Sequence, residues 1–289
     1  MGVAKVSIQW FPGHMAKARR EVVESLKLVD AVLEVVDARM PEASRNPMMA
    51  ELTQGKPRVV VLAKADLADP AVTAEYVRLW STESTVHAVA VDVLRGTGLS
   101  QVARAAQQVT SEKFARLARK GIKRHTIRVV VVGIPNTGKS SLINRLVGKN
   151  VVKTGDRPGV TRRQQWIRAG GKLELLDTPG ILWPKFEDPT VALKLAWSGA
   201  IKSTLVRSEE VAVELLQWLS LFYPERLQDR YGVVAEGDDL DGVLPQIARR
   251  RGAIRAGGEP DVGLAAELVL RDVQTGLLGP ISFDRPADL

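Results

Sequence analysis

The chain has 289 residues, of which 45% are hydrophobic and 26% charged, and it contains no cysteine. This composition excludes long disordered, collagen-like or fibrous structure, and the length predicts about two domains of roughly 150 residues each. The lack of cysteine excludes disulfides, thiolate metal sites and cysteine nucleophiles. Because the chain has neither a membrane-spanning apolar run nor an apolar secretory signal, we expect a cytoplasmic protein without membrane association. The net charge of +8 favours a polyanionic partner.

The first two-thirds of the chain alternates β-branched runs with amphipathic stretches, a pattern typical of a parallel sheet with helical crossovers. We expect strands at Ala31–Val36, Arg58–Ala63, Val86–Val91, Arg128–Val132, Gln164–Arg168 and Leu173–Leu176. The helices expected between them are Ala16–Val29, Pro70–Trp80, Leu99–Arg119 and Lys139–Val147. Continuous apolar runs such as Val129–Val132 predict strands that are covered on both faces.

After Trp183 the strand signals stop, and only helical patterns follow. We expect helices at Pro189–Trp197, Glu209–Phe222, Glu225–Tyr231, Leu240–Arg251 and Asp261–Thr275. The chain is therefore expected to form an α/β domain over residues 1–184 and a smaller all-helical domain over residues 185–289. Pro280 and Pro286 lie in the last ten residues, for which we expect a loose tail.

The strongest local signal is Gly133–Ser140, which reads GIPNTGKS and fits the phosphate-binding pattern GxxxxGK[ST]. It follows an expected strand and opens an expected helix, as this loop requires. Lys139 would place its charge on the β- and γ-phosphates, and the Ser140 hydroxyl would ligate Mg²⁺. A chance match is expected in roughly one chain of this length in a hundred, so we infer nucleotide binding through Asn136, Thr137, Gly138, Lys139, Ser140 and Ser141.

Two downstream segments complete the expected phosphate site. Asp177-Thr178-Pro179-Gly180 begins at a strand end about 40 residues after the phosphate loop; alone, it would more often be a tight turn. In this position Asp177 would hold Mg²⁺ through water and the Gly180 N–H would meet the γ-phosphate. Between the two motifs, the loop Arg157–Arg162 carries Thr161, which is placed to reach the metal.

The expected base site lies upstream of the phosphate loop, in Lys64-Ala65-Asp66 at the end of a strand. The Asp66 carboxylate would accept guanine N1–H and the exocyclic amine, and the Lys64 stem would lie along the ring. Adenine offers neither donor in that geometry, so such a site rejects it. Because this base motif precedes the phosphate loop, we infer a circularly permuted P-loop GTPase domain.

These motifs resemble the ribosome biogenesis GTPase A family, bacterial circularly permuted GTPases with a mitochondrial relative. The likeness runs nearly end to end, through Ile8–Met15, Asp37–Arg39, the phosphate loop, Arg157–Thr161, Asp177–Gly180, Arg255–Glu259 and Ala265–Glu267. It implies a potassium-stimulated GTPase that binds GTP and GDP, uses Mg²⁺ and K⁺, and assists late assembly of the large ribosomal subunit. It also implies that the helical domain contacts large-subunit rRNA, and we expect a monomer.

The sequence departs from the family pattern at the base site. Ala63 replaces the usual asparagine, which removes one side-chain hydrogen bond near the guanine and the phosphate loop. We expect this to weaken nucleotide binding by about 1 kcal/mol, the scale of one neutral hydrogen bond. Asp92 and Val93 are assigned to the loop behind the guanine by position alone, because this loop lacks the common serine-alanine pattern.

The expected catalytic residues are His14, Lys139 and Thr161. Ile181 follows Gly180, where many GTPases carry a water-orienting glutamine, and isoleucine cannot orient water. His14 is the candidate by resemblance; from sequence alone, a structural role at the Pro12–Gly13 turn would be favoured roughly two to one. Asn136 resembles the asparagine that binds K⁺ in related GTPases, whereas without the resemblance a plain turn residue is equally expected.

Basic residues form four clusters, at Lys17–Arg20, Arg116–Arg124, Arg162–Arg163 and Arg249–Arg251. Together they favour contact with an RNA backbone, although a single cluster is more often a solvated surface. Trp166, Trp183 and Trp197 could stack on bases, but core or domain-junction positions are favoured. The alternatives are a GTP-gated RNA-binding adaptor with negligible turnover and, disfavoured by the motif order, a tRNA-modification GTPase.

Overall fold

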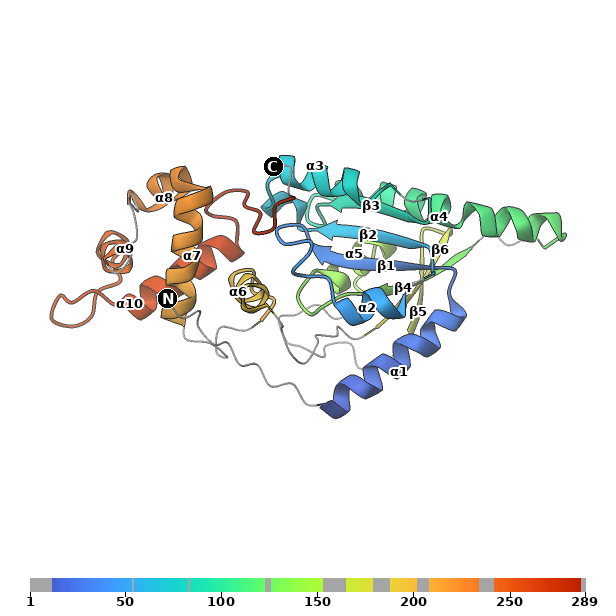
Figure 1. The fold of residues 1–289 in the computed structure, drawn as a ribbon, viewed down its shortest axis with the longest axis horizontal. Helices are drawn as coiled ribbons and strands as arrows, with labels where there is room; N and C mark the ends of the chain where they lie inside the picture. The colour runs from blue at the N-terminus through green and yellow to red at the C-terminus, as the bar shows by residue number, and fades with distance from the viewer. Residues whose placement is uncertain are drawn as a thin grey trace. The chain divides into compact units, whose positions relative to one another are not determined.

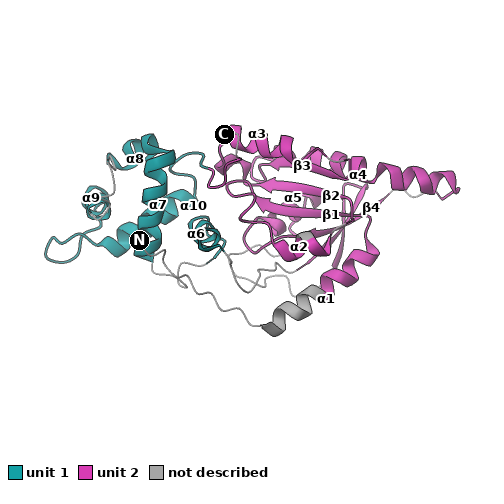
Figure 2. Ribbon diagram, in the orientation of Figure 1, with its two compact units in different colours: residues 1–8, 185–281 teal, residues 9–184, 282–289 magenta. Residues whose placement is uncertain are grey.

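The computed structural model describes residues 12–53, 55–82, 84–122, 126–152, 165–178, 188–201, 208–233 and 242–286, with only the backbone for residues 12–19 and 50. The chain divides into two compact units, one of residues 9–184 and 282–289 and the other of residues 1–8 and 185–281 (Figure 2). No described helix has the length and apolarity needed to cross a membrane.

The larger unit is built on a six-stranded sheet in the order β3-β2-β1-β4-β6-β5 (Figure 1). The strands are β1 (Ala31–Asp37), β2 (Arg58–Ala63), β3 (Val86–Val91), β4 (Ile127–Val132), β5 (Gln165–Ala169) and β6 (Leu173–Asp177). Five strands are parallel to their neighbours, in agreement with the expected parallel core.

Strand β5 differs from that expectation, because it pairs antiparallel with β6 at the sheet edge. The two strands are joined by a tight turn that contains Gly170 and Gly171, with φ of 57° and 73°. Such a turn reverses the chain, whereas a parallel pair requires a long crossover. The glycine pair following the fifth strand was the sequence signal for this reversal.

Helices cover both faces of the sheet. They are α1 (Pro12–Leu28), α2 (Pro47–Leu52), α3 (Pro70–Leu79), α4 (Leu99–Arg119) and α5 (Lys139–Val147), with a 3₁₀ turn, η1, at Ala65–Leu67. Alternate residues of each strand face opposite sides: Leu33 and Val35 pack with α4 and α5, whereas Val32 and Val36 pack toward α1, α2 and α3. The short α2 and η1 were not expected, since each is too short for periodicity to reveal.

Helix α1 begins at Pro12, four residues before the expected start. Pro12 occupies the first helical position, where proline's fixed φ is favourable and its missing N–H is not needed. Gly13 and His14 therefore lie in the first helical turn and not in the separate turn that the sequence suggested.

The smaller unit is all-helical in its described part, as expected. It contains α6 (Pro189–Trp197), α7 (Ser208–Phe222), α8 (Pro224–Tyr231), α9 (Val243–Arg251) and α10 (Val262–Gln274). Leu215 and Leu219 of α7 and Val269 of α10 are fully buried. Trp197 is also buried, and its Nε1–H donates to the Val211 carbonyl at 3.0 Å, so it is a core residue and not a free stacking platform.

The chain end overturns another expectation. Residues 282–286, expected as a loose tail of the helical domain, belong to the larger unit. Ser282, Phe283 and Asp284 are at most 3% exposed, which no periodic pattern over so few residues could reveal.

Candidate functional site: the carboxyl edge of the sheet

The expected nucleotide-binding residues gather at one edge of the sheet. Strands β1, β2, β4 and β6 are parallel, so the segments that follow them lie at the same edge. Adjacent strands β1 and β4 mark the switch point, because β2 and β3 extend the sheet on one side and β6 and β5 on the other. In open α/β sheets, ligands bind at the carboxyl ends beside this point.

The phosphate loop leaves β4 at this switch point and packs closely on β1. A Cβ atom on Gly133 would lie 2.4 Å from the Val35 carbonyl oxygen, so only glycine fits there. Asn136 and Gly138 have positive φ angles of 61° and 97°. These turns point successive backbone N–H groups of the loop inward, where they form a concave, anion-binding surface. The Thr137 hydroxyl stabilises the loop by donating to the Ile134 carbonyl at 2.9 Å.

Lys139 opens α5, and its ammonium also donates to the Ile134 carbonyl, at 2.6 Å. Its side chain lies in a buried position. Burial lowers the pKa of Lys139 to about 8, with Lys64 acting in the same direction and the Asp177 carboxylate opposing. A phosphate group in the loop would supply the negative charge that this buried ammonium requires.

Of the three side chains expected to bind Mg²⁺, those of Ser140 and Asp177 lie at this edge, and Thr161 lies outside the described residues. Ser140 lies in the first turn of α5, and Asp177 is the last residue of β6, where its Cα pairs with Val131 just before the loop. Asp177 is 1% exposed, and neighbouring Thr178 donates its hydroxyl to the Val131 carbonyl at 2.6 Å. One hydroxyl and one carboxylate fit Mg²⁺, which takes few protein ligands and completes its shell with phosphates and water.

A cluster of three or more histidine, cysteine, aspartate or glutamate side chains that could hold a metal is absent from the described residues. Within this part of the chain, no such cluster competes with the Mg²⁺ site expected at Ser140 and Asp177.

The base motif follows β2. Lys64 adopts a left-handed conformation, with φ of 58°, and its ammonium binds Asp37 Oδ2 at 2.9 Å. Asp66 lies in η1 and is partly buried; burial raises the pKa of its carboxyl, and the Asp92 carboxylate raises it further. Paired N–H donors such as those of guanine would stabilise this carboxylate. Ala63, fully buried, abuts the phosphate loop: its Cβ lies 3.7 Å from where a Cβ on Gly138 would be.

Asp92 and Val93 serve the local structure of the β3–α4 loop. The buried Asp92 carboxylate accepts from the N–H groups of Leu94 and Arg95 at 2.9 and 3.0 Å, which shapes the loop. Val93 packs its side chain against the core below α4. The negative charge of this carboxylate also contributes to the raised pKa of Asp66.

Several expected residues lie outside the described part of the chain: Thr161, Gly180, Ile181 and the side chain of His14. The remaining expected residues are brought together, with Ala65 in η1 and Ser141 in the first turn of α5.

One residue that sequence reasoning missed is Asn144, on α5. Its Oδ1 accepts from the N–H groups of Val151 and Val152 at 3.0 and 2.8 Å, and its Nδ2 donates to the Val152 carbonyl. The adjacent Arg145 donates to the Leu94 carbonyl in the β3–α4 loop at 3.3 Å. Helix α5 thus holds both the β3–α4 loop and the segment that follows its own C-terminal end, and a lone asparagine in a helical pattern gives no signal of these contacts.

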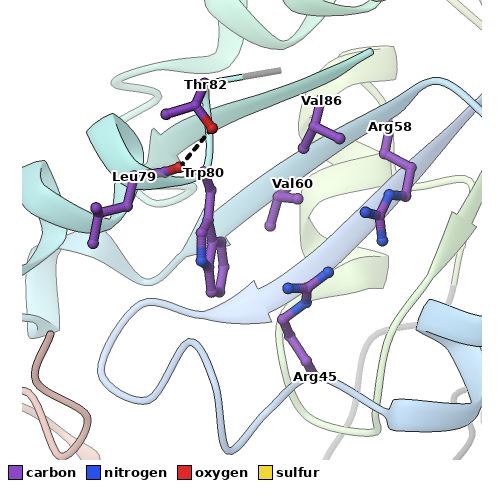
Figure 3. Close-up of a pocket in the computed structure, with 7 residues that line it drawn as sticks. All are labelled: Arg45, Arg58, Val60, Leu79, Trp80, Thr82 and Val86. Atoms are coloured by element: carbon purple, nitrogen blue, oxygen red, sulfur yellow. Dashed lines mark hydrogen bonds between the residues drawn. The ribbon is translucent and has the colours of Figure 1, made fainter. Parts of the chain in front are cut away.

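A separate pocket of about 150 Å³ opens on the face covered by α3, toward the amino ends of β2 and β3 (Figure 3). Arg45 and Arg58 point into it, and both bind the buried Glu34. The Arg45 guanidinium also lies over the Trp80 ring, 4.8 Å from its centroid. The pocket lies away from the carboxyl ends of the strands, so it takes no part in the nucleotide site.

Known proteins resemble this chain over nearly its whole length. The 50S ribosome-binding GTPase family matches residues 128–218. Ribosome biogenesis GTPase A of Priestia megaterium is 51% identical, over 98% of each chain. Mitochondrial ribosome-associated GTPase 1 of Bos taurus is 32% identical, over 96% of this chain and 88% of the relative.

Among solved structures, the GNP-bound YlqF of T. maritima superposes with a TM-score of 0.65 at 26% identity, covering 94% of this chain and 100% of that chain. A GDP-bound form of the YlqF protein gives a TM-score of 0.62 at 27% identity, covering 92% and 99%.

The sheet order, the phosphate loop on its central strand and the upstream base motif define a circularly permuted P-loop GTPase. Within that class, this chain belongs to the ribosome biogenesis GTPase A family.

Proposed function

We propose that this chain is a cytoplasmic, monomeric assembly factor that hydrolyses GTP during late maturation of the large ribosomal subunit. We further propose that it binds rRNA, that the subunit and K⁺ stimulate turnover, and that Mg²⁺ accompanies the nucleotide. The observation that carries the proposal is the convergence of Lys139, Asp177 and Asp66 on one edge of the sheet, in a chain of a ribosome biogenesis GTPase family.

In this proposal each residue has a defined task. Asp66 accepts the guanine N–H groups, and the N–H groups of residues 136–141 cradle the phosphates. Lys139 stabilises the charge that develops as the γ-phosphate leaves. Ser140, Thr161 and Asp177 hold Mg²⁺, which supplies charge neutralisation when bound. His14 orients the attacking water, the Gly180 N–H meets the γ-phosphate, and Asn136 holds K⁺.

The basic surface of α4 supports the RNA-binding part of the proposal. With 21 residues, α4 is about 31 Å long at 1.5 Å per residue, and it projects past the ends of the strands (Figure 1). Its projecting end carries Arg116, Arg119 and, just beyond, Lys120, all of them exposed. A projecting basic helix end can follow a phosphate backbone without a base-specific groove.

A second group of basic residues lies at the end of α9. Arg249, Arg250 and Arg251 are all exposed, and Arg250 also donates to the Tyr231 carbonyl at the end of α8, at 3.1 Å. Trp166 is 44% exposed on edge strand β5, so it is not a core residue, and the Arg128 guanidinium lies 5.3 Å from its ring centroid. This pair adds an aromatic, cationic surface suited to RNA.

The test is GTP turnover of the full chain with purified large subunits, with small subunits and with neither. We expect stimulation by large subunits alone, and loss of turnover in Lys139→Ala and Ser140→Ala variants. Negligible turnover with every addition, together with intact GTP binding, would instead favour the GTP-gated adaptor.

A further inference from the structure

Residues 282–286, here termed the C-terminal strap, lie across the loop that follows β1. The N–H of Phe283 donates to the Arg39 carbonyl at 2.6 Å, and Asp284 Oδ2 accepts from the Ala43 N–H at 2.8 Å. The strap's three residues at positions 282–284 are buried. The strap is therefore an integral part of the larger unit, although residues 185–281 separate it from the rest of that unit in sequence.

The same strap also reaches the loop that follows β2. The N–H of Asp69 donates to the Ser282 hydroxyl at 3.1 Å, two residues after the 3₁₀ turn η1 that contains Asp66. Asp69 in turn caps α3 by accepting from the N–H of Ala71 at 2.9 Å. Consequently the strap joins the Arg39 loop and the base-motif loop, which are neighbours at the carboxyl edge.

A buried charge cluster lies between the strap and the base motif. Arg39 binds Asp37 with two parallel bonds, from Nε to Oδ1 at 2.9 Å and from Nη2 to Oδ2 at 2.8 Å, and both residues are 1% exposed. Lys64 binds the same Asp37 Oδ2 at 2.9 Å. Burial alone would raise the pKa of Asp37, but Arg39 and Lys64 outweigh it and hold that pKa well below its usual range.

This geometry fixes the left-handed Lys64 from which η1 starts. Asp37 is anchored by Arg39, and it holds the Lys64 ammonium at the strand end. Removing one member of such a buried cluster leaves an uncompensated charge, so its members act as a unit. Arg39 also lies within electrostatic reach of Asp66.

We propose that Arg39 is a positioning residue for guanine recognition, and that the C-terminal strap completes the guanine site by locking the Arg39 loop to the Asp66 loop. The inference rests on the proposed role of Asp66 as the guanine acceptor. It assigns to the end of the chain, directly after the helical unit, a part in nucleotide selectivity.

The test compares the affinities of the full-length protein for GDP and for inosine diphosphate, which lacks the exocyclic amine that Asp66 would accept. For the parent protein, we expect a clear preference for GDP. In Ser282→Ala, Asp284→Asn and Arg39→Ala variants that preference should fall about fivefold, the scale of one misplaced hydrogen bond. Arg39→Lys keeps the positive charge but not the two parallel bonds to Asp37. Its preference for GDP should therefore lie between those of Arg39→Ala and the parent.

Asp30→Asn is the matched control, because Asp30 is equally buried and ion-paired to Lys113, at the amino end of β1. It should lower the melting temperature and leave the GDP preference unchanged. An unchanged preference in folded Ser282→Ala and Asp284→Asn proteins would overturn the strap's role. If Asp284→Asn does not fold, the GDP preference of the milder Ser282→Ala variant alone tests the role of the strap.

Asp66→Asn separates this inference from the proposed function. A loss of GDP preference in Asp66→Asn without any loss in the strap variants would refute the strap alone. Unchanged preference in Asp66→Asn would place the base site elsewhere and refute both.

Discussion

At the scale of single residues, the buried ammonium of Lys139 gives nucleotide binding a defined pH dependence. In the nucleotide-free protein its pKa is about 8, and bound phosphates favour the charged form and so raise that pKa. Affinity should thus be greatest below pH 8 and weaken as the pH rises above it, by at most about tenfold per pH unit. GDP titrations from about pH 7 to pH 9 measure this.

The control for this prediction is Lys139→Arg, which keeps its charge throughout that range. The GDP affinity of this variant should be weaker than that of the parent, but it should stay constant over the same pH range. A parent protein whose affinity is equally flat would show that the ammonium does not titrate near pH 8.

A second prediction at this scale concerns Asn136, which lies in the left-handed bend of the phosphate loop. If its side chain holds K⁺ beside the phosphates, the ion would offset charge developing in the transition state. We expect faster turnover in KCl than in NaCl, and an Asn136→Ala variant that no longer distinguishes the salts. Equal parent rates in the two salts would exclude the role.

At the scale of helices and strands, His14 lies in the first turn of α1. Whether its side chain can act on the attacking water therefore depends on where that helix is placed. His14→Ala should lower subunit-stimulated kcat by roughly 10²-fold, the effect of a water-orienting group, with GTP affinity nearly unchanged. Exposed Glu24 on the same helix supplies the control variant Glu24→Ala, which should behave as the parent. A kcat within a few-fold of the parent would make His14 a structural residue.

Helix α4 gives the second prediction at this scale. Replacing Arg116, Arg119 and Lys120 by glutamate should weaken binding to large subunits. It should also reduce the salt dependence of binding: the slope of log affinity against log salt concentration should fall by about 0.7 for each lost phosphate contact. Basal GTP hydrolysis should not change. The exposed Arg104, on the same helix but alongside the sheet, is the matched control for a single reversal. Equal losses from Arg104→Glu and Arg116→Glu would argue against a specific contact at the projecting end.

At the scale of the whole molecule, two compact units allow stability and nucleotide binding to be separated. In the helical unit, buried Asp272 binds Arg230 at 2.8 Å and the Tyr231 hydroxyl at 3.1 Å. Asp272→Ala should destabilise this unit by about 3 kcal/mol, since it leaves a partly buried guanidinium without its carboxylate. Calorimetry should show that this unit unfolds at a lower temperature than in the parent, while GDP affinity stays within twofold of the parent value.

The exposed neighbour Asp229 provides the comparison, and Asp229→Ala should melt as the parent does. Loss of GDP binding in Asp272→Ala would mean that the two units do not unfold independently.

Much of this protein was determined by sequence alone, because the relevant physics is local. The β-branched run Val129–Val132 predicts a buried strand, and the phosphate loop needs only the conformations of eight successive residues. The same reasoning located Lys64 and Asp66 at a strand end and Asp177 at another. Parallel strands then bring those ends together, so the expected site needed no knowledge of individual contacts.

Tertiary structure decided what depends on contacts between distant residues. Asp284 bonds the Ala43 backbone across 241 residues of chain, and neither partner carries a local pattern that reveals the other. The ion pair of Asp37 with Lys64 likewise forms because the neighbouring strands β1 and β2 end side by side at one buried edge. Burial then makes these charges depend on one another, since a charge without its partner is costly only where water is excluded.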